Sequence, residues 1–493
     1  MAAPKVVPAK CPTCGANLPV PPGAFQVMCR YCQNVIHVEH RKPPPEVRPF
    51  GSPGAMPSRT LYVDPMATAA AGKHVGLLIL LGVLIPILLP LIIGVGPLAV
   101  RSCKGTLKPY PITCGLNGRV TVSGDFEGTD PIVTSTEHNC KVHIKNAKLK
   151  GSKLVDTNAF NLELTLENVT IETTEPMIRA GSNLVVKVKG STLTAPGAVF
   201  DSESNMQIDL EGSSVESKNA AAIKSKHNLK VRMDNGKVRG KKAGFDTDSS
   251  FSLTMKNGSE VTASDGPAIK TASSFNLEAD GGKIDGGLVM SSNGKIEATG
   301  LTITSRERAI AATSSLTLDY TEGSITSATD AAIDGTSSLD LTLTNTKVQG
   351  ATTAIVSESN TKIRASKKTQ IIALQDNGIT TTSNSELNLA EATVEAGGKA
   401  FKGTVNDKLK LGQGARLAGK KGGIEVENNV EIEATGATID GGNGPALSAK
   451  YNGRITFKQG TIKGTPALLF ERKPTSLEIE GTRIEGDQKI PAR

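Results

Sequence analysis

The chain has 493 residues, a formal net charge of +8 and no Trp, with only 5 Tyr and 11 Phe. An apolar share of 38% excludes a membrane protein with many spans, and the few aromatic residues argue against an aromatic-rich enzyme core. The charge is uneven, because residues 1–74 carry +5, residues 75–100 carry no charge and residues 101–493 carry +3. The basic character therefore belongs mostly to a short amino-terminal head.

Two Cys-x2-Cys pairs lie in this head, Cys11 with Cys14 and Cys29 with Cys32. Each pair forms a tight turn that offers two thiolates, and two such turns complete a tetrahedral zinc site. In this spacing residues 1–40 resemble a zinc ribbon. The resemblance implies that all four Cys bind Zn²⁺ in a structural site.

The alternative for these four Cys is a pair of disulfides, but the symmetric spacing and the small size of the segment favour a metal. His37 and His40 follow closely and are expected to be solvated, since four thiolates already close the site. A closed site predicts no zinc catalysis. The positive charge permits nucleic-acid binding but does not by itself indicate it.

Residues 41–74 are rich in Pro and small residues and predict an extended, flexible linker. Residues 75–100 follow without a charge and are dominated by Leu, Ile, Val and Gly. A helix of this length is about 39 Å long, more than a ~30 Å hydrocarbon core requires. We therefore expect one transmembrane helix at 75–100, kinked by Pro86 and Pro90. Residues 101–117 form a juxtamembrane segment.

The orientation of this span has arguments on both sides. Arg101, Lys104 and Lys108 follow the span and slightly favour a cytoplasmic carboxyl side. A four-thiolate zinc site, however, suits a reducing compartment, and the Ser/Thr-rich remainder of the chain suits an exterior domain. We expect the amino end to be cytoplasmic and the carboxyl domain to lie outside. Cys103 and Cys114 then suggest a short disulfide loop that leaves Cys140 over.

Internal repetition dominates the rest of the chain, because a unit of about 22 residues recurs from Ser191 to Gly481. Each unit has three apolar clusters: one branched residue, then a small residue followed by a large one, then an alternating pair after Ser or Asn. The third cluster includes Leu229 with Val231, Phe251 with Leu253, and Leu409 with Leu411. Period-two alternation predicts a strand with one buried face.

Three strands per unit without helices predict a mainly β fold, a parallel β-helix of about 15 coils over residues 118–493. The pattern resembles the right-handed, pectin-lyase-like β-helix superfamily, and this resemblance implies a fold and no activity. Surface residues of alternating sign, Asp201, Lys224, Asp246 and Lys270, are expected to stack on adjacent coils.

No catalytic cluster emerges from the sequence. Asp285 and Asp440 both stand in Ile-Asp-Gly-Gly, but the repeat places them seven coils apart, on the order of 34 Å. That distance is too long for a pair of catalytic carboxylates, and Asp-Gly is also a turn signal. The sequence therefore gives no catalytic residue and leans away from an enzyme.

The resulting hypothesis is a single-pass membrane protein of the cell envelope. Its zinc ribbon faces the cytoplasm, and its β-helix is an exterior scaffold or adhesive surface. The expected partners are the lipid bilayer and an envelope polysaccharide or protein. Two alternatives stay open: a polysaccharide lyase or hydrolase, and a membrane sensor whose ribbon binds a partner or nucleic acid.

Overall fold

The computed structural model describes residues 7–10, 17–20, 26–28, 35–37, 110–157 and 159–492. The chain divides into two compact units, residues 1–100 and 101–493. Within the described residues no helix is long and apolar enough to cross a bilayer. The transmembrane segment expected at 75–100 and the linker at 41–74 lie outside them.

The first unit contains two antiparallel hairpins. In one, β1 (Val7–Lys10) pairs with β2 (Asn17–Val20), and in the other β3 (Gln26–Met28) pairs with β4 (Val35–His37). Two small hairpins are compatible with a zinc ribbon, whose metal-binding turns would join the strands of each hairpin.

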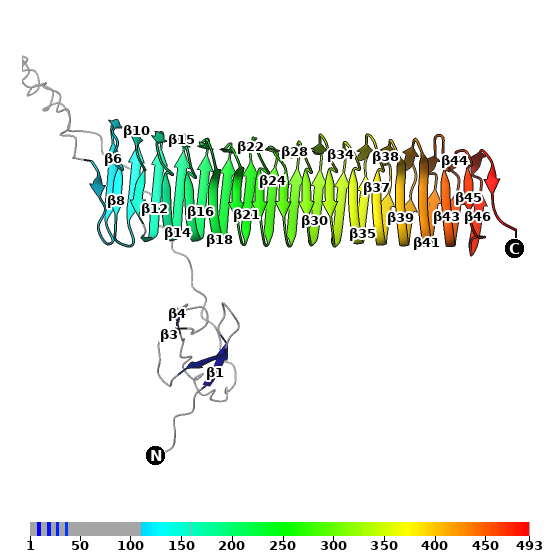
Figure 1. Ribbon diagram of the computed structural model, residues 1–493, viewed down its shortest axis with the longest axis horizontal. Coiled ribbons are helices and arrows are strands. Elements are labelled where there is room, and N and C mark those ends of the chain that lie inside the picture. Colours follow the sequence, from blue (N-terminus) through cyan, green and yellow to red (C-terminus); the bar gives the residue numbers. More distant parts are fainter. Residues whose placement is uncertain are drawn as a thin grey trace, which may run out of the picture. The chain divides into compact units, whose positions relative to one another are not determined.

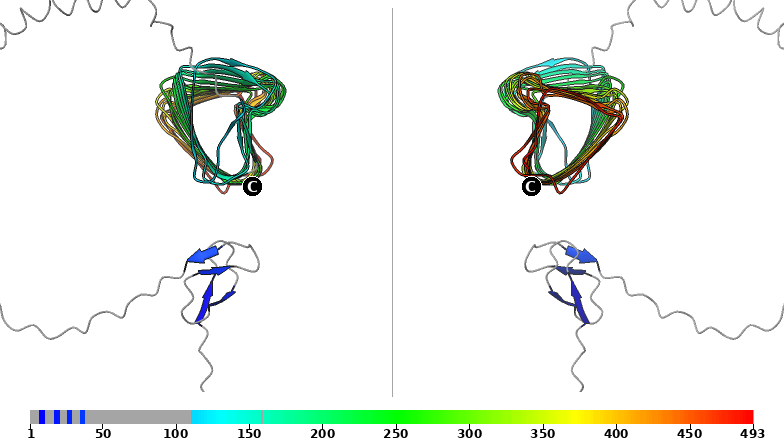
Figure 2. Two further views of the ribbon diagram at one scale, coloured as in Figure 1. Left: turned by 90° about the vertical axis from the view of Figure 1, so that its left-hand side faces the viewer. Right: turned by 90° about the vertical axis from the view of Figure 1, so that its right-hand side faces the viewer.

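The second unit is a parallel β-solenoid of about 17 coils over residues 112–489, which confirms the predicted fold class (Figure 1). It begins at Ile112, before the expected residue 118, and it has more coils than the 15 predicted. The two additional coils lie at the two ends of the solenoid, with short strands at Phe126–Glu127 and Arg483–Glu485, whereas the repeat is recognisable in the sequence only from about residue 147 to residue 481. Seen along its length, successive coils superpose into one closed outline (Figure 2).

One side of each coil is a short strand, and these strands stack into a narrow sheet. Its strands are β7 (Phe126–Glu127), β10 (Lys148–Gly151), β13 (Thr170–Thr173), β15 (Thr192–Ala195), β17 (Ser214–Ser217), β19 (Lys237–Gly240), β22 (Glu260–Ala263), β25 (Lys283–Asp285), β28 (Thr302–Ser305), β31 (Ser324–Ser327), β34 (Lys347–Gly350), β36 (Gln370–Ala373), β38 (Thr393–Ala396), β40 (Arg416–Gly419), β42 (Thr438–Asp440), β44 (Thr461–Lys463) and β47 (Arg483–Glu485).

The other two sides form a wide sheet of 27 strands, in which one corner carries the Ser and Asn residues of the repeat. Its strands are β5 (Ile112–Thr113), β6 (Arg119–Ser123), β8 (Val133–Ser135), β9 (Lys141–Lys145), β11 (Val155–Thr157), β12 (Phe160–Glu167), β14 (Ile178–Lys189), β16 (Phe200–Glu211), β18 (Ala221–Asp234), β20 (Ala243–Thr247), β21 (Phe251–Lys256), β23 (Ile269–Thr271), β24 (Phe275–Asp280), β26 (Leu288–Met290), β27 (Gly294–Thr299), β29 (Ile310–Ala312), β30 (Ser315–Thr321), β32 (Ile333–Gly335), β33 (Ser338–Thr344), β35 (Ile355–Ser366), β37 (Ile379–Leu389), β39 (Lys399–Leu411), β41 (Gly422–Thr435), β43 (Leu447–Lys458), β45 (Leu468–Phe470), β46 (Ser476–Glu480) and β48 (Gln488–Lys489).

The interior is a continuous apolar core, because like residues stack from coil to coil. The first predicted cluster forms one such column, in which Val215 pairs with Val238 and Val238 with Val261. The large residue of the second cluster forms another, in which Ile223 pairs with Phe245. These side chains are at most 1% exposed. A core one coil wide suits Val, Ile and Leu, which explains the scarcity of large aromatic residues.

One predicted alignment is wrong by two residues. The column that contains Leu229 continues to Asp407, and the residue aligned with Val231 is Leu409. Apolarity alone had assigned Leu409 to the place of Leu229. The backbone register instead puts a carboxyl group into the core.

Candidate functional site

The predicted zinc ligands lie outside the described residues, so the zinc site stays a prediction. In sequence, Cys11 and Cys14 fall between β1 and β2, and Cys29 and Cys32 fall between β3 and β4. Each Cys pair therefore lies, in sequence, between the two strands of one hairpin. That distribution suits a tetrahedral site built from two turns.

Asp285 and Asp440 occupy one column of the narrow sheet and are separated by seven coil steps, as the sequence predicts. Asp285 accepts hydrogen bonds from Lys283 Nζ (2.9 Å) and Thr304 Oγ1 (2.9 Å). Partial burial alone would raise the pKa of Asp285, but these two hydrogen bonds outweigh it and lower the pKa. Asp440 Oδ1 accepts a hydrogen bond from the backbone N–H of Gly442, a short-range bond that is typical of an Asp-Gly turn.

A hollow on the wide sheet contains the carboxylates that the sequence did not reveal. Glu278 pairs in register with Glu297, and Glu297 pairs with Asp319, so three carboxylates stack on consecutive coils. They line a hollow of about 400 Å³ together with Asp280. Strand spacing puts adjacent members about 4.8 Å apart and the outer two about 10 Å apart. All four are exposed, and Lys295 forms an ion pair of 2.6 Å with Glu297.

The hollow lies over small interior side chains. Ala279 and Ala298 form its floor, between the larger interior side chains of Met255 and Tyr320 in the same column. The coil here is also short, since Asp285 and Thr304 are paired at a spacing of 19 residues.

A second hollow of about 580 Å³ adjoins the first and shares Thr254, Lys256 and Glu278 with it. We call the two together the acidic groove. Its charged residues comprise two basic and seven acidic side chains, namely Arg232, Lys256, Asp209, Glu211, Asp234, Glu278, Asp280, Glu297 and Asp319. The groove therefore crosses several coils of the wide sheet with a strong excess of negative charge.

Sequence reasoning missed the acidic groove because it followed only the column of Asp285. The acidic residues stand at the outward positions of the third cluster, between the apolar residues that define the strand. Their alignment needs one short step of 19 residues, from Glu278 to Glu297, followed by a regular step of 22 residues to Asp319.

The predicted charge column is confirmed in register, since Asp201 pairs with Lys224, Lys224 with Asp246 and Asp246 with Lys270. Burial raises the pKa of Asp201, although Lys224 and Arg179 oppose the shift. Elsewhere, oppositely charged side chains bridge adjacent coils directly. These pairs include Lys141–Glu163, Lys150–Glu127, Lys189–Glu211, Lys226–Glu203, Lys237–Glu260, Lys399–Glu425, Lys408–Glu431 and Lys450–Glu427.

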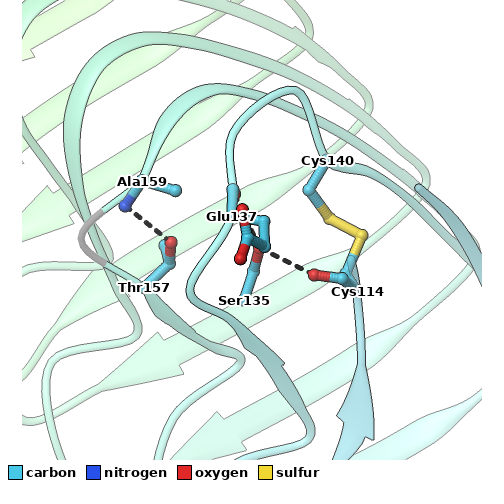
Figure 3. The surroundings of a disulfide bond; sticks show 6 residues. All are labelled: Cys114, Ser135, Glu137, Cys140, Thr157 and Ala159. Carbon is cyan, nitrogen blue, oxygen red and sulfur yellow. Dashed lines mark hydrogen bonds between the residues drawn. A yellow bond between two sulfur atoms is a disulfide. The ribbon is translucent and has the colours of Figure 1, made fainter. Parts of the chain in front are cut away.

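The cysteines of the solenoid correct a prediction. Cys114 is bonded to Cys140 rather than to Cys103, which lies outside the described residues (Figure 3). The two Cys stand on adjacent coils, and each is 1% exposed. Beside them Ser135 Oγ donates a hydrogen bond of 3.1 Å to the carbonyl of Cys114. The disulfide therefore ties the first coil to the second.

In the parts of the chain that the structure describes, no three His, Cys, Asp or Glu side chains are placed to hold a metal ion. Comparisons with protein-family models, with curated proteins and with solved structures found no match to this chain. The structure therefore shows the class of fold, which is a parallel β-solenoid.

Proposed function

We propose that this chain is a membrane-anchored β-solenoid of the cell envelope that serves as a rigid scaffold and binding surface. The observation that carries the proposal is the uninterrupted stack of about 17 coils, braced by ion pairs between neighbouring coils. Such a rod presents repeated side-chain columns over a long surface, which suits an extended ligand. An envelope polysaccharide or an extended protein segment is a ligand of that kind.

The disulfide supports an exterior location for the solenoid. Disulfides form and persist in oxidising compartments and are rare in the cytosol. Cys114 and Cys140 are buried partners on neighbouring coils, so the folded rod itself brings them together. The residues after the apolar segment at 75–100 would then lie outside.

The amino-terminal side of the proposal rests on the sequence. Residues 75–100 would anchor the chain in the bilayer by a single helix. Cys11, Cys14, Cys29 and Cys32 would hold one structural Zn²⁺ in the reducing cytoplasm. Zinc would there stabilise a segment that is too small to bury a core of its own.

The acidic groove is the proposed contact surface. Its carboxylates accept hydrogen bonds from sugar hydroxyls, and their charge favours neutral or amino-bearing polymers over uronic polymers. The test is a binding screen of residues 101–493 against these three classes of polysaccharide. We expect binding to a neutral or amino-bearing polymer that weakens at least tenfold in the triple variant Glu278→Gln, Glu297→Gln, Asp319→Asn. Binding that is unchanged in the triple variant would remove the groove from the proposal.

A second candidate is a polysaccharide hydrolase, and the stacked carboxylates favour it. Glycoside hydrolysis uses two carboxyl groups about 5–10 Å apart, a range that the column of Glu278, Glu297 and Asp319 spans. We rank it second because these side chains are exposed and Glu297 is already paired with Lys295. Turnover of any polymer from the screen, lost in Glu297→Gln, would reverse the ranking.

A further inference from the structure

Asp407 occupies an interior position that is apolar in most coils. Its column contains Leu184, Met206, Leu229 and Phe251 in earlier coils, and the uncharged polar residues Thr361 and Ser385 in the two coils directly before it. Asp407 is only 1% exposed, and among the described residues it is the one carboxyl side chain that is buried. A carboxyl group here displaces packing that an apolar residue would provide.

One carboxyl oxygen of Asp407 accepts hydrogen bonds, and the other has no hydrogen-bond donor. Oδ1 accepts hydrogen bonds from Ser385 Oγ (2.5 Å) and Thr381 Oγ1 (3.2 Å), both on β37. Oδ2 has no hydrogen-bond partner. It lies so near Gly403 that a Cβ added there would be 2.0 Å from it. Oδ2 therefore lies against the backbone of Gly403 and has no donor that would stabilise a negative charge on it.

No charged side chain on the neighbouring strands is buried beside Asp407 to compensate a negative charge on its carboxyl group. Strands β37, β39 and β41 flank it in the stack, and β38 and β40 lie on the narrow sheet of the same coils. The titratable residues of these five strands all stand at exposed or half-buried positions, alternating with the buried ones. They are Glu386, Glu395, Lys399, Lys402, Lys408, Lys410, Arg416, Glu425, Glu427, Glu431 and Glu433.

We propose that Asp407 makes its coil a pH-sensitive point of the rod, well packed while the carboxyl holds a proton and loosened when the proton leaves. An ionised carboxylate in an apolar interior without a counter-charge is strongly unfavourable. A neutral carboxyl costs much less. The device would let a rise in pH open the rod locally around β39 while distant coils stay closed, because each coil depends mainly on its neighbours.

The direction of the pH effect follows from the protonation states. Burial raises the pKa of Asp407, and the hydrogen bonds from Ser385 and Thr381 only partly oppose it. In the window between the unfolded pKa of about 4 and this raised folded pKa, the folded coil keeps a proton that the opened coil has lost. Stability is therefore highest below that window and falls as the pH rises through it. Within the window the opening constant rises about tenfold per pH unit.

Hydrogen exchange of the full-length protein tests this proposal. Exchange is measured at pH 5 and pH 8, with each rate corrected for the intrinsic pH dependence of amide exchange. We expect peptides from 399–411 to lose at least tenfold protection at pH 8, while peptides from 229–234 in a distant coil do not. In Asp407→Asn, which mimics the neutral acid, the loss at 399–411 should disappear.

Two controls make the result decisive. Asp246→Asn removes a carboxylate from an outward-facing column and should leave the wild-type pH difference intact. Asp407→Leu restores the apolar residue of the column and, if the Asn variant fails to fold, should again abolish the difference. Equal protection of 399–411 at both pH values in the wild type overturns the proposal. A pH difference that persists in both Asp407 variants does so as well.

Discussion

Asparagine is the residue that turns the corner of the wide sheet. At this corner Asn117, Asn139, Asn161, Asn183, Asn205 and Asn228 all have φ between 53° and 61°. Each of the five that follow Asn117 donates from its side-chain amide to the side-chain oxygen of the Asn one coil earlier, at 2.7–3.0 Å. Asn tolerates the left-handed conformation better than other residues with a side chain, and its amide both donates and accepts. Stacked coils therefore turn these Asn residues into a hydrogen-bonded ladder.

Asn205 tests the ladder, because it donates to Asn183 at 3.0 Å and accepts from Asn228 at 2.9 Å. Asn205→Ala loses two hydrogen bonds and adds strain at positive φ, which together predict a loss of about 2–3 kcal/mol in unfolding free energy. Asn205→Gly keeps the backbone relaxed and should lose less. Chemical denaturation of residues 101–493 measures both variants.

The matched control for the ladder is Asn388→Ala, which removes an exposed Asn from an outward position of β37. This change should stay within about 0.5 kcal/mol of the wild type. If Asn205→Ala were no more destabilising than the control, the ladder would contribute nothing measurable. If Asn205→Gly were as destabilising as Asn205→Ala, the strain at positive φ would have no part in the effect.

The strands at the amino end of the solenoid are held by fewer neighbouring strands than those in its middle. An inner coil is held by a neighbour on both sides, whereas the described strands of the first coil, β5, β6 and β7, pair only with the second coil. An open sheet edge exposes unpaired backbone groups and frays easily. The bond between Cys114 and Cys140 fastens this first coil. The disulfide therefore stabilises the amino end of the solenoid.

Loss of the disulfide should therefore loosen the end of the rod and spare its middle. The sequence separation of 26 residues corresponds to about 3–4 kcal/mol of loop-closure entropy. In Cys114→Ala we expect lower exchange protection in 112–145 and unchanged protection in 315–344. A uniform loss along the rod would mean that the coils unfold as one unit, contrary to the nearest-neighbour account.

Most of the solenoid could be predicted from sequence because the same apolar pattern recurs in nearly every coil. The columns through Val215 and Ile223 follow from apolar periodicity alone, and the structure confirms their register. Features that depend on side-chain size or on polar residues in apolar columns were harder to predict. Asp407 breaks the alternation that marks its strand, and the acidic groove is lined by the small side chains of Ala279 and Ala298. The bond between Cys114 and Cys140 required the coil register at the weakly repetitive amino end.

The proposed envelope role requires that the solenoid lies outside the cell. The most direct measurement places one epitope tag before Met1 and another after Arg493, and treats intact cells that express the chain with an external protease. We predict that the carboxyl-terminal tag is removed from intact cells, while the amino-terminal tag is lost only after lysis. Protection of the carboxyl-terminal tag until lysis would place the solenoid inside the cell and contradict the proposed envelope role.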